Sequence, residues 1–233
     1  MNSVITYILA MICLLPATVG AIRYKRIDVR HVPLVFMMLL DVAMETIYRM
    51  KIHAGLAFNV YLTVNFALYL YLASGSKYVS NIFMWALVWV SIMIGSLNYV
   101  FFDVLCKPFL NEQSNLTLLH SIYLLCYVSV VALFISIKIL SKQIIEINSK
   151  LTKNFWFWAG ISFILYNAYT LLIFGENIFA LSNTSYGKTI GVIHHFVNVA
   201  YYLFLTVAIL KASNNTVPFS IKFSNNKISG YPV

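Results

Sequence analysis

Long apolar stretches limit the fold of this chain more strongly than any other feature of its sequence. A helix needs roughly 20 mainly apolar residues to cross the hydrocarbon core of a bilayer. Continuous apolar runs of this length indicate helices, because the strands of a membrane barrel alternate apolar and polar residues. Seven stretches qualify: Val4–Ile22, Val32–Tyr48, Gly55–Ala73, Asn81–Phe101, Leu116–Leu140, Phe155–Phe174 and Ile190–Ala212. We therefore expect an all-α, polytopic membrane bundle of seven transmembrane helices over residues 1–212.

The composition excludes an ordinary water-soluble domain. Of the 233 residues, 61% are hydrophobic and 10% are charged, whereas soluble domains carry about 25% charged residues. The formal net charge of +9 could indicate nucleic-acid binding, but no basic run interleaved with aromatic residues lies outside the apolar stretches. We expect the lipid bilayer, including its anionic head groups, as a partner and no nucleic acid.

The positions of the basic residues predict the orientation of the bundle. Four of them, Arg23, Lys25, Arg26 and Arg30, follow the first apolar stretch, and 12 of the 16 lysines and arginines fall on the same predicted side. Cytoplasmic loops carry the excess of Lys and Arg. The N-terminus is thus expected outside and the C-terminus inside, with residues 213–233 as a short, disordered cytoplasmic tail. The expected location is a cell membrane, crossed several times, of the bacterial inner-membrane type.

Ionisable residues within the second apolar stretch are the first candidates for function. Asp41, Glu45 and Arg49 are spaced i, i+4, i+8, which places them along one stripe of a helix. Such groups are costly in a membrane and usually face the bundle interior. They could form a proton relay, a cation site or the counter-ion of a ligand; alternatively, Glu45 and Arg49 form a structural pair near the outer interface.

Polar residues on three further stretches complete the set. Tyr61, Asn65 and Tyr69 share a helix face, where hydrogen bonding between helices is the simpler role. The sixth stretch contributes Tyr166, and the seventh contributes His194, His195 and Asn198. The candidates for ligand binding or proton handling are Asp41, Glu45, Asn65, Tyr166, His194, His195 and Asn198.

The sequence carries little indication of a metal or catalytic centre. A catalytic zinc site needs three protein ligands, and Glu45, His120 and His194 would have to converge from three different helices. No HExxH motif and no CxxC motif occurs among the 233 residues. We expect no cofactor and assign no catalytic residue, with a zinc site as the alternative.

Several segments resemble one group of membrane proteins. These are AIRYKR after the first stretch, FNVYLTVNF in the third, FWFWAGISFILYNAYTLLIF in the sixth and GVIHHFVNVAYYLFLTVAILK in the seventh. The chain resembles small seven-helix membrane proteins of Bacteroidetes-type bacteria, which are similar to the membrane-embedded input regions of some sensor kinases. The resemblance implies a shared polar cluster of His194, His195 and Asn198, with Trp156 and Tyr166. Asn65 departs from it, because an acidic residue is expected there.

Four functions remain open from the sequence, the last of them a structural or assembly subunit of a larger complex. The first is a sensory, ligand-binding bundle that acts through a partner protein and binds a small molecule. The second is a transporter or channel for a small solute or proton, in which Asp41 and Glu45 bind the coupling ion or substrate. The third is an intramembrane metal-dependent hydrolase. Non-enzymatic function is favoured over enzymatic function.

Overall fold

The computed structural model describes residues 3–49, 55–76, 78–98, 116–146, 151–178 and 185–212. Over these ranges the chain is helical, with seven α-helices, short 3-10 turns and no β-strand. The α-helices are α1 (Ser3–Arg23), α2 (Val32–Arg49), α3 (Gly55–Ser74), α4 (Asn81–Asn98), α5 (Leu116–Glu146), α6 (Phe155–Ile178) and α7 (Ser185–Lys211).

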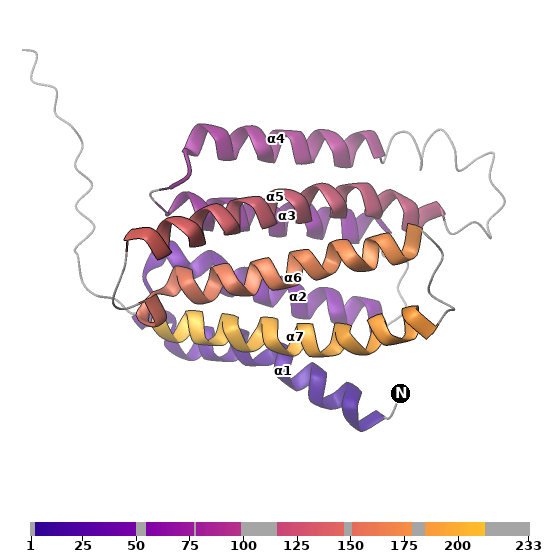
Figure 1. Cartoon of the computed structure of the whole chain (residues 1–233), viewed down its shortest axis with the longest axis horizontal. Coiled ribbons are helices and arrows are strands. Elements are labelled where there is room, and N and C mark those ends of the chain that lie inside the picture. The colour runs from indigo at the N-terminus through magenta and orange to yellow at the C-terminus, as the bar shows by residue number, and fades with distance from the viewer. Residues whose placement is uncertain are drawn as a thin grey trace, which may run out of the picture.

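The helices lie side by side and alternate in direction along the chain (Figure 1). As a result, α1, α3, α5 and α7 finish at the same end of the bundle at which α2, α4 and α6 begin. Many of the basic residues gather there, and we call this end the basic end. Its Lys and Arg residues are Arg23, Lys25, Arg26, Arg30, Lys138, Lys142, Lys153 and Lys211.

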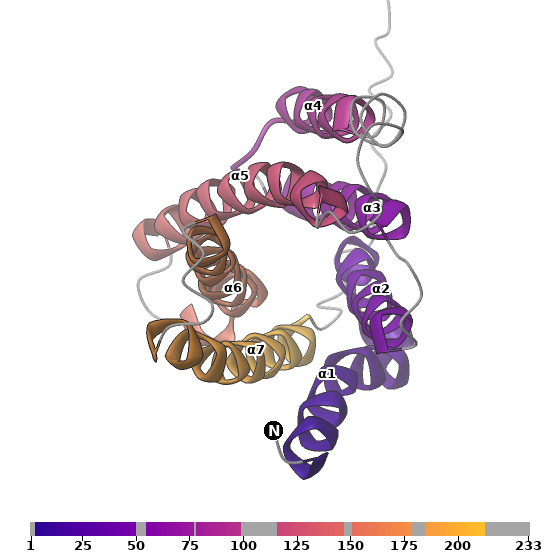
Figure 2. The ribbon, with the colours of Figure 1, turned by 90° about the vertical axis from the view of Figure 1, so that its right-hand side faces the viewer.

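All of the α-helices except α4 form a closed ring, and α4 lies outside it (Figure 2). Around the ring the main contacts run from α1 to α2, α3, α5, α6 and α7, and from α7 back to α1. Helix α4 packs against α3 and α5 on the outside of the ring. Helices on opposite sides of the ring therefore meet mainly through the side chains that fill its interior.

Specific hydrogen bonds hold the helices together at the basic end. The Arg23 guanidinium donates to the carbonyl of Leu210, which joins the end of α1 to the end of α7 at 2.8 Å. Asn154 caps α6 by accepting from the Trp156 N–H, and its amide donates to Gln143 of α5 at 2.6 Å. Because an uncapped helix end leaves backbone N–H groups unpaired, this asparagine fixes the start of α6 against α5.

The outward faces of the described helices are apolar. Helix α4 shows this most clearly, since Ile82 is 84% exposed, Trp85 64% and Leu97 65%. A contiguous apolar surface of this kind is rare on soluble monomers and marks contact with a partner or a membrane. The largest fully buried side chains, including Phe66, Leu34 and Met38, lie within the helix packing.

The all-helical prediction is confirmed, and each of the seven apolar stretches contains an α-helix. Two segments of the described chain, Leu124–Glu146 and Phe155–Ile173, are long and apolar enough to cross a membrane. The helix ends differ from those expected. Helix α5 continues from Leu140 to Glu146 because Lys, Gln and Glu are good helix formers, so loss of apolarity does not end the helix.

Helix α7 begins at Ser185 rather than at Ile190. Its first turn contains Ser185, Gly187 and Lys188, which interrupt the apolar pattern without ending the helix. The expected tail at 213–233 and the segment at 99–115 lie outside the described residues. The predicted orientation, with the N-terminus outside, stays a prediction.

Candidate functional site

A partly buried group of polar side chains between α2 and α3 centres on Asp41. This residue lies at the middle of α2, roughly 14 Å along the helix from its first residue at 1.5 Å per residue. The Tyr61 hydroxyl of α3 donates to Asp41 Oδ1 at 2.6 Å, and Asn65 Nδ2 donates to the same oxygen at 3.0 Å. Asn65 Nδ2 also lies 3.2 Å from the Tyr61 hydroxyl. The three side chains form one triad between α2 and α3.

The spacing of the residues on α3 creates this arrangement. Tyr61 and Asn65 are four residues apart, so they lie on the same face of the helix, one turn apart. That face is turned toward α2, which brings both donors to a single carboxylate oxygen. A carboxylate only accepts hydrogen bonds when it is ionised, and therefore the amide nitrogen of Asn65, rather than its oxygen, must face Asp41.

The triad has more acceptor atoms than donors. Both hydrogen bonds to Asp41 end on Oδ1, and no described residue donates to Oδ2. The Oδ1 atom of Asn65 is buried without a hydrogen-bond partner. A buried acceptor without a donor costs about 1–3 kcal/mol. One carboxylate oxygen and one neighbouring amide oxygen, neither with a described donor, favour the approach of a donor that carries positive charge.

Aromatic side chains fill the interior of the helix bundle beside the triad. Tyr69 of α3 packs edge to face on Phe163 of α6, with ring centroids 4.8 Å apart. Phe163 contacts Tyr201 of α7 at 6.3 Å, and Tyr201 stacks on Tyr166 of α6 at 4.4 Å. Edge-to-face and offset arrangements of this kind are the favourable ones for aromatic pairs. The run of rings connects α3, α6 and α7 across the interior.

The triad and the aromatic run interact electrostatically. The Tyr61 hydroxyl interacts electrostatically with the phenol groups of Tyr166 and Tyr201. Negative ring faces attract cations, so the aromatic surroundings and the carboxylate favour the same kind of ligand.

Two other hydroxyl groups in the interior have structural roles. Tyr69 donates to the carbonyl of Ala132 at 2.9 Å and lies 2.8 Å from the Ser136 hydroxyl, both on α5. Ser162 of α6 donates to the carbonyl of Tyr201 on α7 at 2.9 Å. Hydrogen bonds between helices are the expected role of such residues, and these bonds fix α3 to α5 and α6 to α7.

The structure brings together some of the predicted site residues. Asp41 and Asn65 belong to one triad, and Tyr166 belongs to the adjoining aromatic run. Tyr61 and Tyr201 were not among the predicted site residues. The i, i+4 spacing of Tyr61 and Asn65 could have identified the first, whereas Tyr201 carries no pattern that separates it from other tyrosines of a Tyr-rich chain.

The remaining candidates are not joined to the triad by the described contacts. The side chains of Glu45, His120 and His194 lie outside the described part of the structure. His195 and Asn198 are partly buried on α7, and Asn198 shares a helix face with Tyr201 at i, i+3. Within the residues searched, no group of three His, Cys, Asp or Glu side chains is placed to hold a metal ion.

A second polar cluster lies at the basic end, between α1 and α2. Asp28 caps a 3-10 turn (Val29–His31) and pairs with Arg30, whose Nη2 lies 2.6 Å from Asp28 Oδ2. The hydrogen bond from this guanidinium holds the pKa of Asp28 at about 2. His31 stacks on Phe155 with centroids 3.8 Å apart. Burial lowers the pKa of His31 to about 4, so it is neutral at pH 7.

Comparison with protein-family models, with curated proteins and with solved structures finds no match to this chain.

Proposed function

We propose that this chain is an integral membrane protein whose seven helices cross the bilayer, with the basic end in the cytoplasm. The distribution of apolar and charged surface supports this placement. The outer faces of the helices carry exposed Ile, Trp, Phe and Leu side chains. Eight of the ten described Lys and Arg residues lie at the basic end, whereas Arg49 and Lys188 lie at the opposite end (Figure 1). Cytoplasmic loops collect such residues, and lipid accepts apolar side chains that water does not.

Within this bundle we propose a sensory, ligand-binding function centred on Asp41. The observation that carries it is the surplus of acceptors in the triad: Asp41 Oδ2 and the buried Asn65 Oδ1 both lack a described donor. A carboxylate in a membrane interior needs a positive partner or a proton. In this proposal the signal passes to a partner protein.

The chemistry of the site favours a small organic cation with N–H groups. An ammonium group can donate to Asp41 Oδ2 and Asn65 Oδ1 and can neutralise the carboxylate. An aromatic or aliphatic body on such a ligand can pack on the partly buried Tyr166, which stacks on Tyr201. The ligand class is therefore a primary amine with a small apolar group.

Binding of benzylammonium by the purified protein tests this proposal. We expect benzylammonium to raise the thermal stability of the wild-type protein in detergent micelles. Asp41→Asn should weaken its binding at least about tenfold, since a charged hydrogen bond contributes roughly 1.5–3 kcal/mol. Tetramethylammonium has the same charge but no N–H donors, and it should bind more weakly than benzylammonium.

Asp28→Asn is the matched control for this experiment. It removes a carboxylate that pairs with Arg30 at the basic end and lies outside the interior of the ring. The variant should bind benzylammonium as the wild type does. Equal loss of binding in both variants, or binding that survives Asp41→Asn, would overturn the Asp41 site.

Transport of a cation or proton is the second candidate function, because the same carboxylate could bind a coupling ion. Reconstituted proteoliposomes separate the two functions. If the protein transports, it takes up methylammonium or moves protons down a gradient, and Asp41→Asn abolishes this flux. Binding without flux supports the sensory function.

A further inference from the structure

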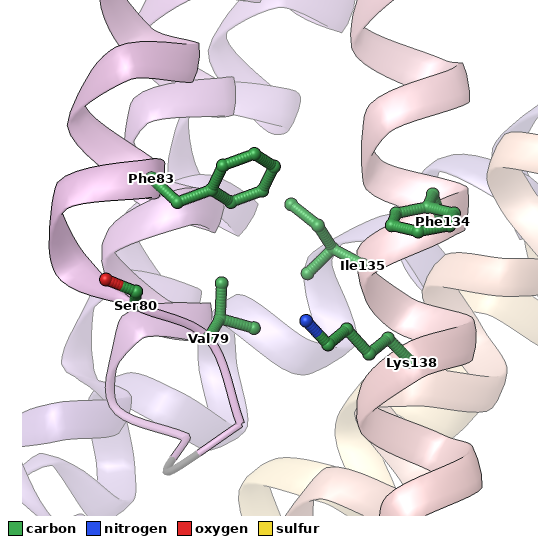
Figure 3. A pocket seen from close by; sticks show the side chains of 6 residues that line it. All are labelled: Val79, Ser80, Phe83, Phe134, Ile135 and Lys138. Atoms are coloured by element: carbon green, nitrogen blue, oxygen red, sulfur yellow. The ribbon is translucent and has the colours of Figure 1, made fainter.

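The groove between α4 and α5 at the basic end is a second feature with the chemistry of a ligand site (Figure 3). It has a volume of about 160 Å³ and is lined by Val79, Ser80, Phe83, Phe134, Ile135 and Lys138. It lies outside the helix ring and shares no lining residue with the Asp41 site. We propose that this groove binds an anionic phospholipid.

Polar and apolar groups are ordered along the groove as they are along a phospholipid. Lys138 is the first charged residue of α5 after the apolar run from Leu116 to Ile137, and it marks the depth at which the helix leaves the hydrocarbon. Phe134 lies one helical turn deeper on the same face. On the α4 side, Ser80 stands just before the helix and Phe83 lies within its first turn.

Lys138 supplies the charge that selects an anionic head group. Figure 3 shows its ammonium group extended across the groove toward Val79, with Ser80 on the far side of Val79. A head-group phosphate there could accept a hydrogen bond from the Lys138 ammonium. The groove also lies at the amino end of α4, where the helix dipole adds partial positive charge.

The apolar part of the groove suits an acyl chain. Val79 and Ile135 are buried and form its floor, whereas Phe83 and Phe134 are exposed and form its rims. In the proposed membrane placement, lipid is the molecule that surrounds these rims. A free phosphate ion would use Lys138 but would leave the apolar half unfilled.

The shape of the groove follows from how the chain enters α4. Helix α3 ends in a turn in which the Gly75 and Ser76 N–H groups donate to the carbonyls of Leu72 and Ala73. The chain then crosses to α5, where the Tyr78 hydroxyl donates to Glu146 at 2.9 Å. This contact anchors the entry to α4 near the end of α5.

This inference rests on the proposed membrane placement but not on the cation site. The test is native mass spectrometry of the delipidated protein in detergent, titrated with phosphatidylglycerol or phosphatidylcholine. The wild type should retain one phosphatidylglycerol in preference to phosphatidylcholine. Lys138→Gln should weaken phosphatidylglycerol binding about fivefold, the effect of one basic residue near an anionic lipid surface.

Two further variants make the result specific. Lys142→Gln removes a charge one turn away on α5 that does not line the groove, and it should leave the preference for phosphatidylglycerol unchanged. Phe83→Ala should weaken the binding of both lipids, because it removes an apolar side chain from the rim of the groove. Equal effects of the two lysine variants, or full competition by inorganic phosphate, would overturn the proposal.

Asp41→Asn separates this inference from the proposed ligand site. That variant should bind phosphatidylglycerol as the wild type does, even if it no longer binds benzylammonium. A failure of the cation site therefore leaves the lipid site standing. Loss of lipid preference in Lys138→Gln with normal benzylammonium binding supports the lipid site as an independent one.

Discussion

At the scale of single residues, the hydroxyl of Tyr69 has a role that can be isolated. The side chain is buried, and its hydroxyl bonds to Ala132 and Ser136 of α5. Removal of this hydroxyl leaves the Ala132 carbonyl with one hydrogen bond fewer. The ring itself keeps its contact with Phe163.

We expect Tyr69→Phe to lower the free energy of unfolding in detergent by about 1 kcal/mol, the typical net value of one such hydrogen bond. Tyr71→Phe is the matched control, because Tyr71 lies on the same helix and is 61% exposed. Chemical denaturation followed by circular dichroism measures both. An equal change in the two variants would show that the buried hydrogen bond contributes nothing specific.

The partly buried imidazole of His31 should make the free energy of unfolding depend on pH. Its folded-state pKa is about 4, below the ordinary value of 6.5, so the unfolded chain binds more protons between these values. The contribution of the neutral His31 side chain to the free energy of unfolding is complete above pH 6.5 and is lost as the pH falls toward 4. At pH 5 the loss is about 2 kcal/mol.

Thermal unfolding of the wild type and His31→Phe at pH 7 and pH 5 measures this effect. Phenylalanine keeps a ring to stack on Phe155 but does not titrate, so the variant should lose less stability than the wild type on acidification. Asp28 contributes little in this range, because its ordinary pKa of 3.8 and its folded value of about 2 both lie below pH 5. Identical pH profiles would contradict the assignment to His31.

The site residues could be predicted only in part from the sequence. Asp41 is identifiable because a carboxylate inside an apolar stretch is costly. Its pairing with Tyr61 and Asn65 depends on how α2 and α3 are rotated against each other, which helix periodicity does not determine. The stacking of Tyr166 on Tyr201 likewise depends on the packing of α6 against α7.

At the scale of helices, close packing of α1 on α2 depends on Gly20. A Cβ atom at this position would lie 2.7 Å from Cγ2 and 2.9 Å from Cγ1 of Val35. Valine is stiff at χ1, so the side chain cannot easily move away. Small residues at helix contacts in membranes allow this kind of approach.

Gly20→Ala should therefore destabilise the protein by about 1–3 kcal/mol, the usual cost of overpacking. Gly160→Ala is the control, because its Cβ would meet Leu140 at 3.6 Å, an ordinary contact. Thermal unfolding of both variants, and of Gly20→Ala combined with Val35→Ala, checks the prediction. The double variant should recover part of the loss; no recovery would place the cost elsewhere.

The helices themselves follow from the sequence more directly than their packing does. Apolar stretches such as Phe155–Phe174 and Leu116–Leu140 predict where helices exist, because length and apolarity are local properties. The end of α5 differs from the expected one because polar helix formers continue the helix beyond its apolar part. The start of α7 at Ser185 has no such explanation, since Ser and Gly are not strong helix formers. The position of α4 outside the ring could not be predicted, since all seven stretches are similarly apolar.

At the scale of the whole molecule, the ring of six helices gathers the polar groups into its interior and leaves apolar faces outside. The alternation of helix direction places most of the described basic residues at one end (Figure 1). Both proposed sites depend on this architecture: the Asp41 site on the interior of the ring, and the lipid site on the groove beside α4. The placement of the bundle in a membrane is the central claim.

Labelling of single cysteines in intact cells tests that claim most directly. The native residues Cys13, Cys106 and Cys126 are first replaced by alanine, and then one cysteine is introduced at Lys25 or Lys153 of the basic end, or at Gly55 or Ser185 of the opposite end. We expect a membrane-impermeant maleimide to label the cysteines at positions 55 and 185 in intact cells, and those at 25 and 153 only after the cells are opened. Labelling of positions 25 and 153 in intact cells, or of all four positions on the same side, would contradict the account.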